Sequence, residues 1–202
     1  MNQPNNFQGA YLRLVVRSEE KGEALKALFP EYTKQSELAI VENMEAPGAF
    51  DKAVQGVTRI AHLASPLPGP HQTDNEHAYL LPAREGVLNL LKSAAKSESV
   101  KRVVYTSSAL AVLDHGTPGN VPYDSPLVSL IHCRRTWTEK DWNPITWEEG
   151  KTAKNPIIAY GASKKHAEKA AWEFMETEKP HFDLISLDAP GVFGYVSKLR
   201  KD

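Results

Sequence analysis

Short apolar segments alternate along this chain with longer amphipathic ones. The apolar segments span residues 11–16, 38–41, 60–64, 103–106 and 184–187. Strands that are apolar almost throughout, separated by helical stretches, are typical of a parallel sheet that is covered on both faces. The pattern therefore predicts an α/β fold built on a doubly wound parallel sheet.

The segments between these strands predict several helices and one long loop. Ser18 is suited to cap a helix that Pro30 ends, and apolar residues recur at helical spacing in 76–97 and 159–178. Pro47 precedes a short segment, 48–55, for which we also expect a helix. Residues 109–153 are rich in Gly, Pro, Asp and Trp and show no periodicity, so we expect a long loop with little regular structure.

Composition excludes several classes of protein. The 202 residues contain 24 Lys and Arg against 25 Asp and Glu, a net charge of −1, which disfavours binding to nucleic acid or to an anionic membrane. No apolar run approaches the roughly 20 residues that span a bilayer. Cys133 is the single cysteine, so no internal disulfide can form, and residues 1–8 lack the features of a secretory signal. We expect one cytoplasmic domain.

The most informative chemical feature is the pair Tyr160 and Lys164 at the start of a predicted helix. The i, i+4 spacing places the phenol and the ammonium on one helix face, where the cation is expected to lower the tyrosine pKa. An isolated pair of this kind is usually a surface aromatic beside a solvated lysine. The run 106–108, Thr-Ser-Ser, ends the preceding strand and places hydroxyls at the carboxyl edge of the sheet, where such folds bind ligands. For Ser107 we expect a hydrogen bond to backbone rather than a catalytic role.

Several further motifs occur in order with this pair. They are Ala-Ser-Pro at 64–66, Glu-Gly-Val-Leu-Asn-Leu-Leu at 85–91, Val-Lys-Arg-Val-Val-Tyr-Thr-Ser-Ser at 100–108, Asp-Trp-Asn-Pro at 141–144 and Pro-Gly-Val-Phe-Gly at 190–194. Over residues 11–194 the chain resembles the extended short-chain dehydrogenase/reductase family, also called the NAD-dependent epimerase/dehydratase family. The resemblance is to its dihydroflavonol-reductase-like and fungal ketone/aldehyde reductase branch.

The resemblance implies a Rossmann-type fold and the reduction of a carbonyl by NADPH. It implies that Tyr160 protonates the carbonyl oxygen of a small-molecule substrate and that Ser108 holds this oxygen by a hydrogen bond. Lys164 would lower the tyrosine pKa and bind the ribose of the nicotinamide nucleotide.

The resemblance also implies a set of cofactor contacts. Arg17 and Lys21 follow the first strand at the place of the residues that bind the adenosine 2′-phosphate, which favours NADP over NAD. The alternative is a solvated helix start in which Lys21 pairs with a neighbouring glutamate. The remaining implied cofactor contacts are Asn43, Met44, Ala64, Ser65, Tyr160, Lys164, Pro190 and Val192.

The departures from the family pattern set further expectations. The chain has no Gly-x-x-Gly-x-x-Gly turn, and the strand at 11–16 corresponds to the second strand of the family. We therefore expect residues 1–202 to form a single incomplete NADP-binding domain that lacks the first strand, the glycine-rich turn and the C-terminal substrate lobe, with impaired activity. No set of histidines or cysteines has metal-ligand spacing, and His62 is expected in the core.

Two other functions stay open at this stage. One is a related enzyme, such as a steroid dehydrogenase or a nucleotide-sugar epimerase. The other is a non-catalytic protein that acts only through the helices at 76–97 and 159–178, which resemble the pair that forms homodimers in the family.

Overall fold

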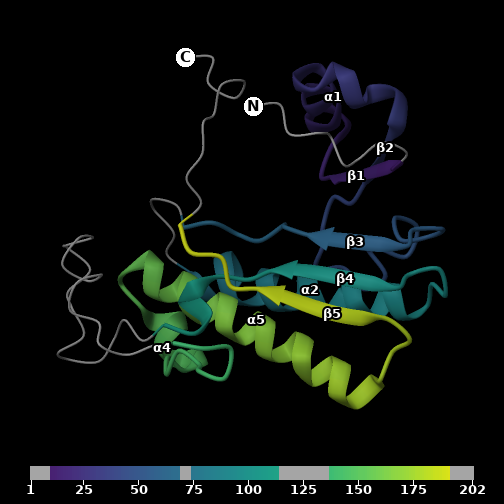
Figure 1. Cartoon of the computed structure of the whole chain (residues 1–202). Coiled ribbons are helices and arrows are strands. Elements are labelled where there is room, and N and C mark those ends of the chain that lie inside the picture. The colour runs from purple at the N-terminus through teal and green to yellow at the C-terminus, as the bar shows by residue number, and fades with distance from the viewer. Residues whose placement is uncertain (1–9, 69–73, 114–136, 192–202) are drawn as a thin grey trace, which may run out of the picture. The chain divides into compact units, whose positions relative to one another are not determined.

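The computed structural model describes residues 10–68, 74–113 and 137–191 (Figure 1). The chain divides into two compact units, and each is described by itself. The first comprises Met1–Asn43 with Phe193–Asp202, and the second comprises Met44–Val192.

The first unit is one β–α–β unit. Strand β1 (Leu12–Val16) leads into helix α1 (Glu19–Leu28), and a 3-10 helix, η1 (Pro30–Gln35), leads into strand β2 (Ser36–Ile40). The two strands pair in parallel with Leu14 opposite Leu38. The Ser18 side chain accepts a hydrogen bond from the backbone of Lys21 and begins α1, as the sequence predicts.

The second unit holds a three-stranded parallel sheet. Strands β3 (Arg59–His62), β4 (Arg102–Thr106) and β5 (Asp183–Leu187) lie in the order β3-β4-β5. Each begins within two residues of its expected position, and the parallel pairing confirms the predicted α/β class. Figure 1 shows helices α2 (Leu81–Ala95) and α5 (Pro156–Glu178) together on one face of this sheet. The described strands thus form two separate parallel sheets, of two and three strands.

A proline changes the geometry of the helix expected at 76–97. Residues Glu76–Leu80 form a π-helical segment, η2, in which the Leu81 N–H donates to the Glu76 carbonyl, and α2 begins only at Leu81. Pro82 cannot donate a backbone hydrogen bond, and its ring would press on the carbonyl four residues earlier in a regular α-helix. The wider π turn relieves both conflicts.

The short helix expected at 48–55 is wrong. This segment is a series of turns. Asp51 N donates to Gly48 O and Gln55 N donates to Lys52 O, three residues back, whereas Val54 N donates to Phe50 O, four residues back. Gly48 adopts a φ of 74°, in the left-handed region, so an α-helix cannot run through it.

The loop expected at 109–153 contains more regular structure than its composition indicates. A 3-10 turn, η3 (Ala109–Ala111), follows β4, and a short helix, α4 (Trp147–Thr152), precedes α5. Thr146 and Glu149 form a capping box at the start of α4, a signal that is readable in the sequence. Residues 114–136, which include Cys133, lie outside the described residues.

The core of the second unit lies between its sheet and helices α2 and α5. Side chains with almost no exposed surface come from all three elements, among them Leu80, Val87, Leu91, Val103, Tyr105 and Ala167. His62 belongs to this core, as expected, because its ring stacks on Tyr105 with 5.9 Å between the ring centroids. None of the helices in the described part of the chain is long and apolar enough to cross a membrane.

Candidate active site

Tyr160 and Lys164 lie in the first half of helix α5, whose start is strongly determined by the sequence. The Asn155 side chain accepts a hydrogen bond from Ile157 N at 3.0 Å, and Pro156 occupies the first helical position, where its missing N–H costs nothing. Tyr160 is half-buried and Lys164 is buried. The i, i+4 spacing therefore gives the shared helix face that the sequence predicts.

Ser108 comes from the other side of the site, two residues beyond the end of β4. Backbone hydrogen bonds from Ser107 N to Leu187 O and from Ala109 N to Ala189 O, each 3.0 Å, continue the pairing of β4 with β5 past both strands. The side chain of Ser108 is buried and accepts from Leu110 N at 3.2 Å. Ser108 is thus held on a fixed backbone.

The structure brings the three expected catalytic side chains together. The Ser108 hydroxyl lies near enough to the Tyr160 phenol to act on its pKa. The Nζ atom of Lys164 lies 5.7 Å from the centre of the Tyr160 ring and donates to the Thr106 carbonyl at 3.0 Å. This carbonyl hydrogen bond fixes the lysine against the end of β4.

The expected lowering of the tyrosine pKa is not what the structure shows. Burial raises the pKa of Tyr160 above its ordinary value, and the nearby Ser108 hydroxyl opposes this shift only in part. The Lys164 ammonium is directed at the Thr106 carbonyl instead of at the phenol oxygen. Tyr160 is therefore a neutral proton donor at neutral pH.

Burial also affects the protonation of Lys164. Desolvation lowers the pKa of Lys164 to about 8, and the nearby Glu168 carboxylate opposes this shift.

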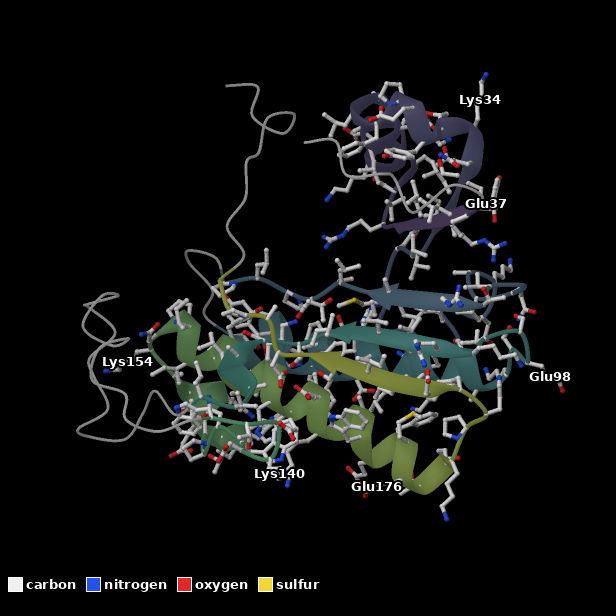
Figure 2. All side chains as sticks on the ribbon, viewed as in Figure 1. Lys34, Glu37, Glu98, Lys140, Lys154 and Glu176 are labelled. Carbon is white, nitrogen blue, oxygen red and sulfur yellow. The ribbon has the colours of Figure 1, made fainter. Side chains whose placement is uncertain are left out.

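Labelled surface residues of the second unit, such as Glu98, Lys140 and Glu176, point outward in Figure 2. Lys164 and Glu168, in contrast, are only 3% and 4% exposed.

Ser107 takes part in a side-chain network that the sequence analysis missed. Its hydroxyl donates to Glu168 Oε2 at 2.5 Å, so the expected hydrogen bond to backbone is wrong. The other carboxylate oxygen, Oε1, accepts from Trp172 Nε1 at 3.2 Å. The Asp188 carboxyl group, just beyond β5, lies close to Glu168 and Ser107, and its buried Oδ1 atom has no hydrogen-bond partner in the described residues. The spacing of Lys164, Glu168 and Trp172 by four residues is the signal that could have identified this face of α5.

Three of the residues expected to contact cofactor lie in the first unit. Arg17 follows β1, Lys21 lies in the first turn of α1, and Asn43 ends the unit; all three are exposed. Among the residues that the structure describes, neither Arg17 nor Lys21 forms an ion pair, whereas Lys26 pairs with Glu23. The expected alternative, in which Lys21 pairs with a neighbouring glutamate, is therefore not what the structure shows.

The other expected cofactor contacts belong to the second unit. Met44 packs its side chain on Gly86, where an added Cβ would lie 3.0 Å from the Met44 sulfur. Ala64 is exposed beyond the carboxyl end of β3, and the Ser65 hydroxyl is buried without a hydrogen-bond partner in the described residues. Pro190 is exposed beyond β5, and Val192 lies outside the described residues.

Relatives at substantial identity span nearly the whole of this chain. An oxidoreductase of Schizosaccharomyces pombe is 41% identical over 186 residues, which are 92% of this chain and 52% of that protein. The NADPH-dependent methylglyoxal reductase of Saccharomyces cerevisiae is 38% identical over 186 residues, or 88% of this chain and 50% of that protein. The chain thus spans about half the length of the curated relatives that it matches. No protein-family model matches it.

Solved structures agree with these relatives. The yeast methylglyoxal/isovaleraldehyde reductase complexed with NADPH superposes with a TM-score of 0.79 at 34% identity, covering 93% of this chain and 52% of that one. Vestitone reductase from alfalfa, at 24% identity and a TM-score of 0.60, shows the same fold over 89% of this chain and 48% of its own. With this fold and these sequence identities, the chain is a member of the short-chain dehydrogenase/reductase family, in the branch of the fungal ketone and aldehyde reductases.

Proposed function

We propose that this chain carries the proton-transfer half of an NADPH-dependent reductase that converts an aldehyde or ketone to an alcohol. The observation that carries the proposal is the geometry of Lys164, whose Nζ atom lies 5.7 Å from the centre of the Tyr160 ring and donates to the Thr106 carbonyl, two residues before Ser108 at the carboxyl end of β4. A hydroxyl pair beside a buried cation is the arrangement that a carbonyl oxygen needs while it gains a proton.

In this proposal each residue has one role. Ser108 donates a hydrogen bond to the carbonyl oxygen and holds it next to the Tyr160 hydroxyl. Tyr160 gives its proton to that oxygen, and the resulting phenolate is stabilised by the neighbouring Lys164 ammonium. NADPH, when bound, supplies the hydride that the carbonyl carbon accepts.

Some residues of this chain fit parts of such a cofactor, but the sequence has no motif that fits its pyrophosphate. Lys164 and the unpartnered hydroxyl of Ser65 lie near the carboxyl edge of the sheet and fit the ribose and nicotinamide end. Arg17 and Lys21 are exposed cations one helical turn apart and fit the 2′-phosphate. The sequence offers no glycine-rich turn for the pyrophosphate.

The relatives favour a carbonyl substrate over the alternatives from the sequence. The proteins at 37% and 38% identity are named as an aldehyde reductase and a methylglyoxal reductase. An epimerase for a nucleotide sugar matches at 14% identity, which supports the fold alone. A homodimer, a single Rossmann-type domain and a cytoplasmic location stay predictions.

Two forms of the protein test this function. The first is the 202-residue chain, and the second is the same chain completed at both ends with the matching segments of the yeast methylglyoxal reductase. NADPH oxidation is followed with a panel of aldehydes and ketones and, separately, with a nucleotide sugar. We expect turnover of carbonyl compounds by the completed chain.

The 202-residue form is expected to bind NADPH poorly. Each missing charge-assisted phosphate contact is worth about 1.5 to 3 kcal/mol, so two or three of them weaken binding by several orders of magnitude. Steady turnover with micromolar NADPH by the 202-residue form would contradict this expectation. A completed chain that converts nucleotide sugars but no aldehyde or ketone would contradict the proposed reaction, and a completed chain without any activity would favour the non-catalytic alternative.

A further inference from the structure

Two hydrogen bonds join the end of β4 to successive turns of α5. The Thr106 carbonyl accepts from Lys164 at 3.0 Å, and Ser107 donates to Glu168 at 2.5 Å. The first involves Lys164, which has a proposed role in the reaction. The second involves Glu168, which the proposed mechanism does not use and which is 4% exposed.

Two neighbouring side chains donate hydrogen bonds to the buried Glu168 carboxyl group. Its Oε2 atom accepts from Ser107 and its Oε1 atom accepts from Trp172 Nε1 at 3.2 Å. A second carboxyl group, that of Asp188, lies close enough for Glu168 to raise its pKa. The Asp188 Oδ1 atom is buried without a hydrogen-bond partner in the described residues, which favours the protonated form of that carboxyl group.

The pair of carboxyl groups holds its proton mainly on Asp188. Burial and the adjacent Glu168 raise the pKa of Asp188 to about 7. Asp188 is therefore the member of the pair that is protonated below neutral pH, whereas both oxygens of Glu168 accept hydrogen bonds from protein donors.

The charge of Glu168 acts on Lys164 one helical turn away. Desolvation disfavours the lysine ammonium, and the Glu168 carboxylate is the charge that opposes this effect. In the part of the chain that the structure describes, the other titratable groups that face the lysine are Tyr105 from β4, His62 from β3 and Tyr160 from α5 itself. Burial disfavours the charged form of each of the three, so they are neutral at pH 7.

We propose that Glu168 is a positioning residue that keeps the Lys164 ammonium charged beside Tyr160, and that Glu168 and Asp188 share one proton beneath the site. The proposal deepens the proposed function and rests on the role given there to Lys164. Loss of the Glu168 charge would leave the lysine buried without an anion, and its proton would be released at lower pH.

Two NMR titrations of the 202-residue chain test the proposal without cofactor or turnover. The first follows the Cε chemical shift of Lys164 against pH in the unsubstituted protein and in Glu168→Gln, with Glu173→Gln as the matched control. Glu173 is an exposed glutamate on the same helix. We expect Glu168→Gln to lower the titration midpoint of Lys164 by about one pH unit and the control to leave it unchanged. Equal midpoints in the unsubstituted protein and Glu168→Gln would overturn the role of Glu168.

The second titration needs no substitution of Glu168, so it remains decisive if that variant does not fold. The indole N–H of Trp172 donates to Glu168 and reports on the carboxyl pair. Its resonance should shift with a midpoint near pH 7, and Asp188→Asn should abolish the shift. A resonance that does not move near pH 7, or that moves equally in Asp188→Asn, would overturn the shared proton. Because both measurements report protonation alone, their failure is distinguishable from a failure of the proposed reductase activity.

Discussion

The two units have the same local pattern of strand and helix but differ in what they bury. In the described part of the first unit, no apolar side chain is buried; Gly22 and Ser36 are the buried residues there. In the second unit, many apolar side chains between the sheet and its helices are fully buried, such as Leu80 and Val103. Two strands and one helix cannot enclose a core, whereas three strands and two long helices can. The alternation of apolar and amphipathic segments thus predicts the strands and helices, but it does not predict which of them bury apolar side chains.

The residues proposed to bind the 2′-phosphate and the residues proposed to transfer a proton belong to different units. The cations that fit a phosphate, Arg17 and Lys21, lie on the weakly packed first unit. The groups that would transfer a proton, Ser108, Tyr160 and Lys164, lie on the well-packed second unit. We therefore expect cofactor affinity and chemistry to respond to different perturbations.

The largest expected difference between the units is in amide hydrogen exchange. Amides of β1 and β2 should exchange by local opening, since few buried apolar contacts hold them, whereas amides of β4 and the middle of α5 should require global unfolding. With a global stability of about 5 kcal/mol, the protection of the two groups should differ by about 10³-fold. Exchange measured residue by residue by NMR checks this, and equal protection of β1 and β4 would contradict the comparison.

Acid should destabilise the second unit through His62. Burial lowers the pKa of His62 to about 4, below its ordinary value of 6.5. The folded state therefore binds fewer protons than the unfolded state between these two pH values. The contribution of His62 to the free energy of unfolding is thus fully present above pH 6.5 and decreases as the pH falls toward 4. The loss is of the order of 3 kcal/mol at about 1.4 kcal/mol per pKa unit.

The replacement His62→Phe isolates this effect. Phenylalanine keeps a flat ring against Tyr105 and Phe50 but cannot titrate. Urea unfolding at pH 7 and pH 4.5, followed by Trp fluorescence, should show a smaller acid loss in His62→Phe than in the unsubstituted protein. An identical loss in both would assign the acid sensitivity to other groups.

Two glycines give a matched test of packing in the two units. An alanine Cβ at Gly150 would lie 2.4 Å from the Ala162 Cβ, so α4 and α5 would have to separate. An alanine Cβ at Gly22 would lie 2.5 Å from the end of the Leu38 side chain, which is only half-buried and can move. We expect Gly150→Ala to cost about 1 to 3 kcal/mol in unfolding free energy. Gly22→Ala should cost less than about 1 kcal/mol because alanine is the better helix former. A larger loss of unfolding free energy in Gly22→Ala than in Gly150→Ala would contradict the expected difference in packing between the two units.

The sequence predicts the elements of this fold better than their exact form. Strand positions follow from apolar runs, and the start of α1 follows from Ser18. The turns around Gly48 and the π segment before Pro82 depend on backbone geometry that periodicity does not contain. The capping box of Thr146 and Glu149, in contrast, was available in the sequence and predicts α4.

In the candidate site, too, the sequence predicts which residues are involved better than their exact geometry. The spacing of Tyr160 and Lys164 places both on one face of α5 from the sequence alone. The direction of the Lys164 ammonium does not follow from that spacing, because the Thr106 carbonyl accepts its hydrogen bond from another element. The contact of Glu168 with Asp188 joins residues from α5 and the end of β5, so it requires the folded chain.

The most direct test of the account compares one residue from each unit in the completed chain. Tyr160→Phe and Arg17→Ala are examined by titration with NADPH and NADH and by single-turnover reduction of an aldehyde at saturating NADPH. We expect Tyr160→Phe to slow reduction by about 10² to 10⁴-fold with NADPH affinity nearly unchanged, because it removes the proton donor and little packing. Arg17→Ala should weaken NADPH binding by about tenfold or more, narrow the preference over NADH, and leave the single-turnover rate intact. A Tyr160→Phe protein that keeps half of the unsubstituted rate, or equal affinities of the unsubstituted protein for NADPH and NADH, would contradict the account.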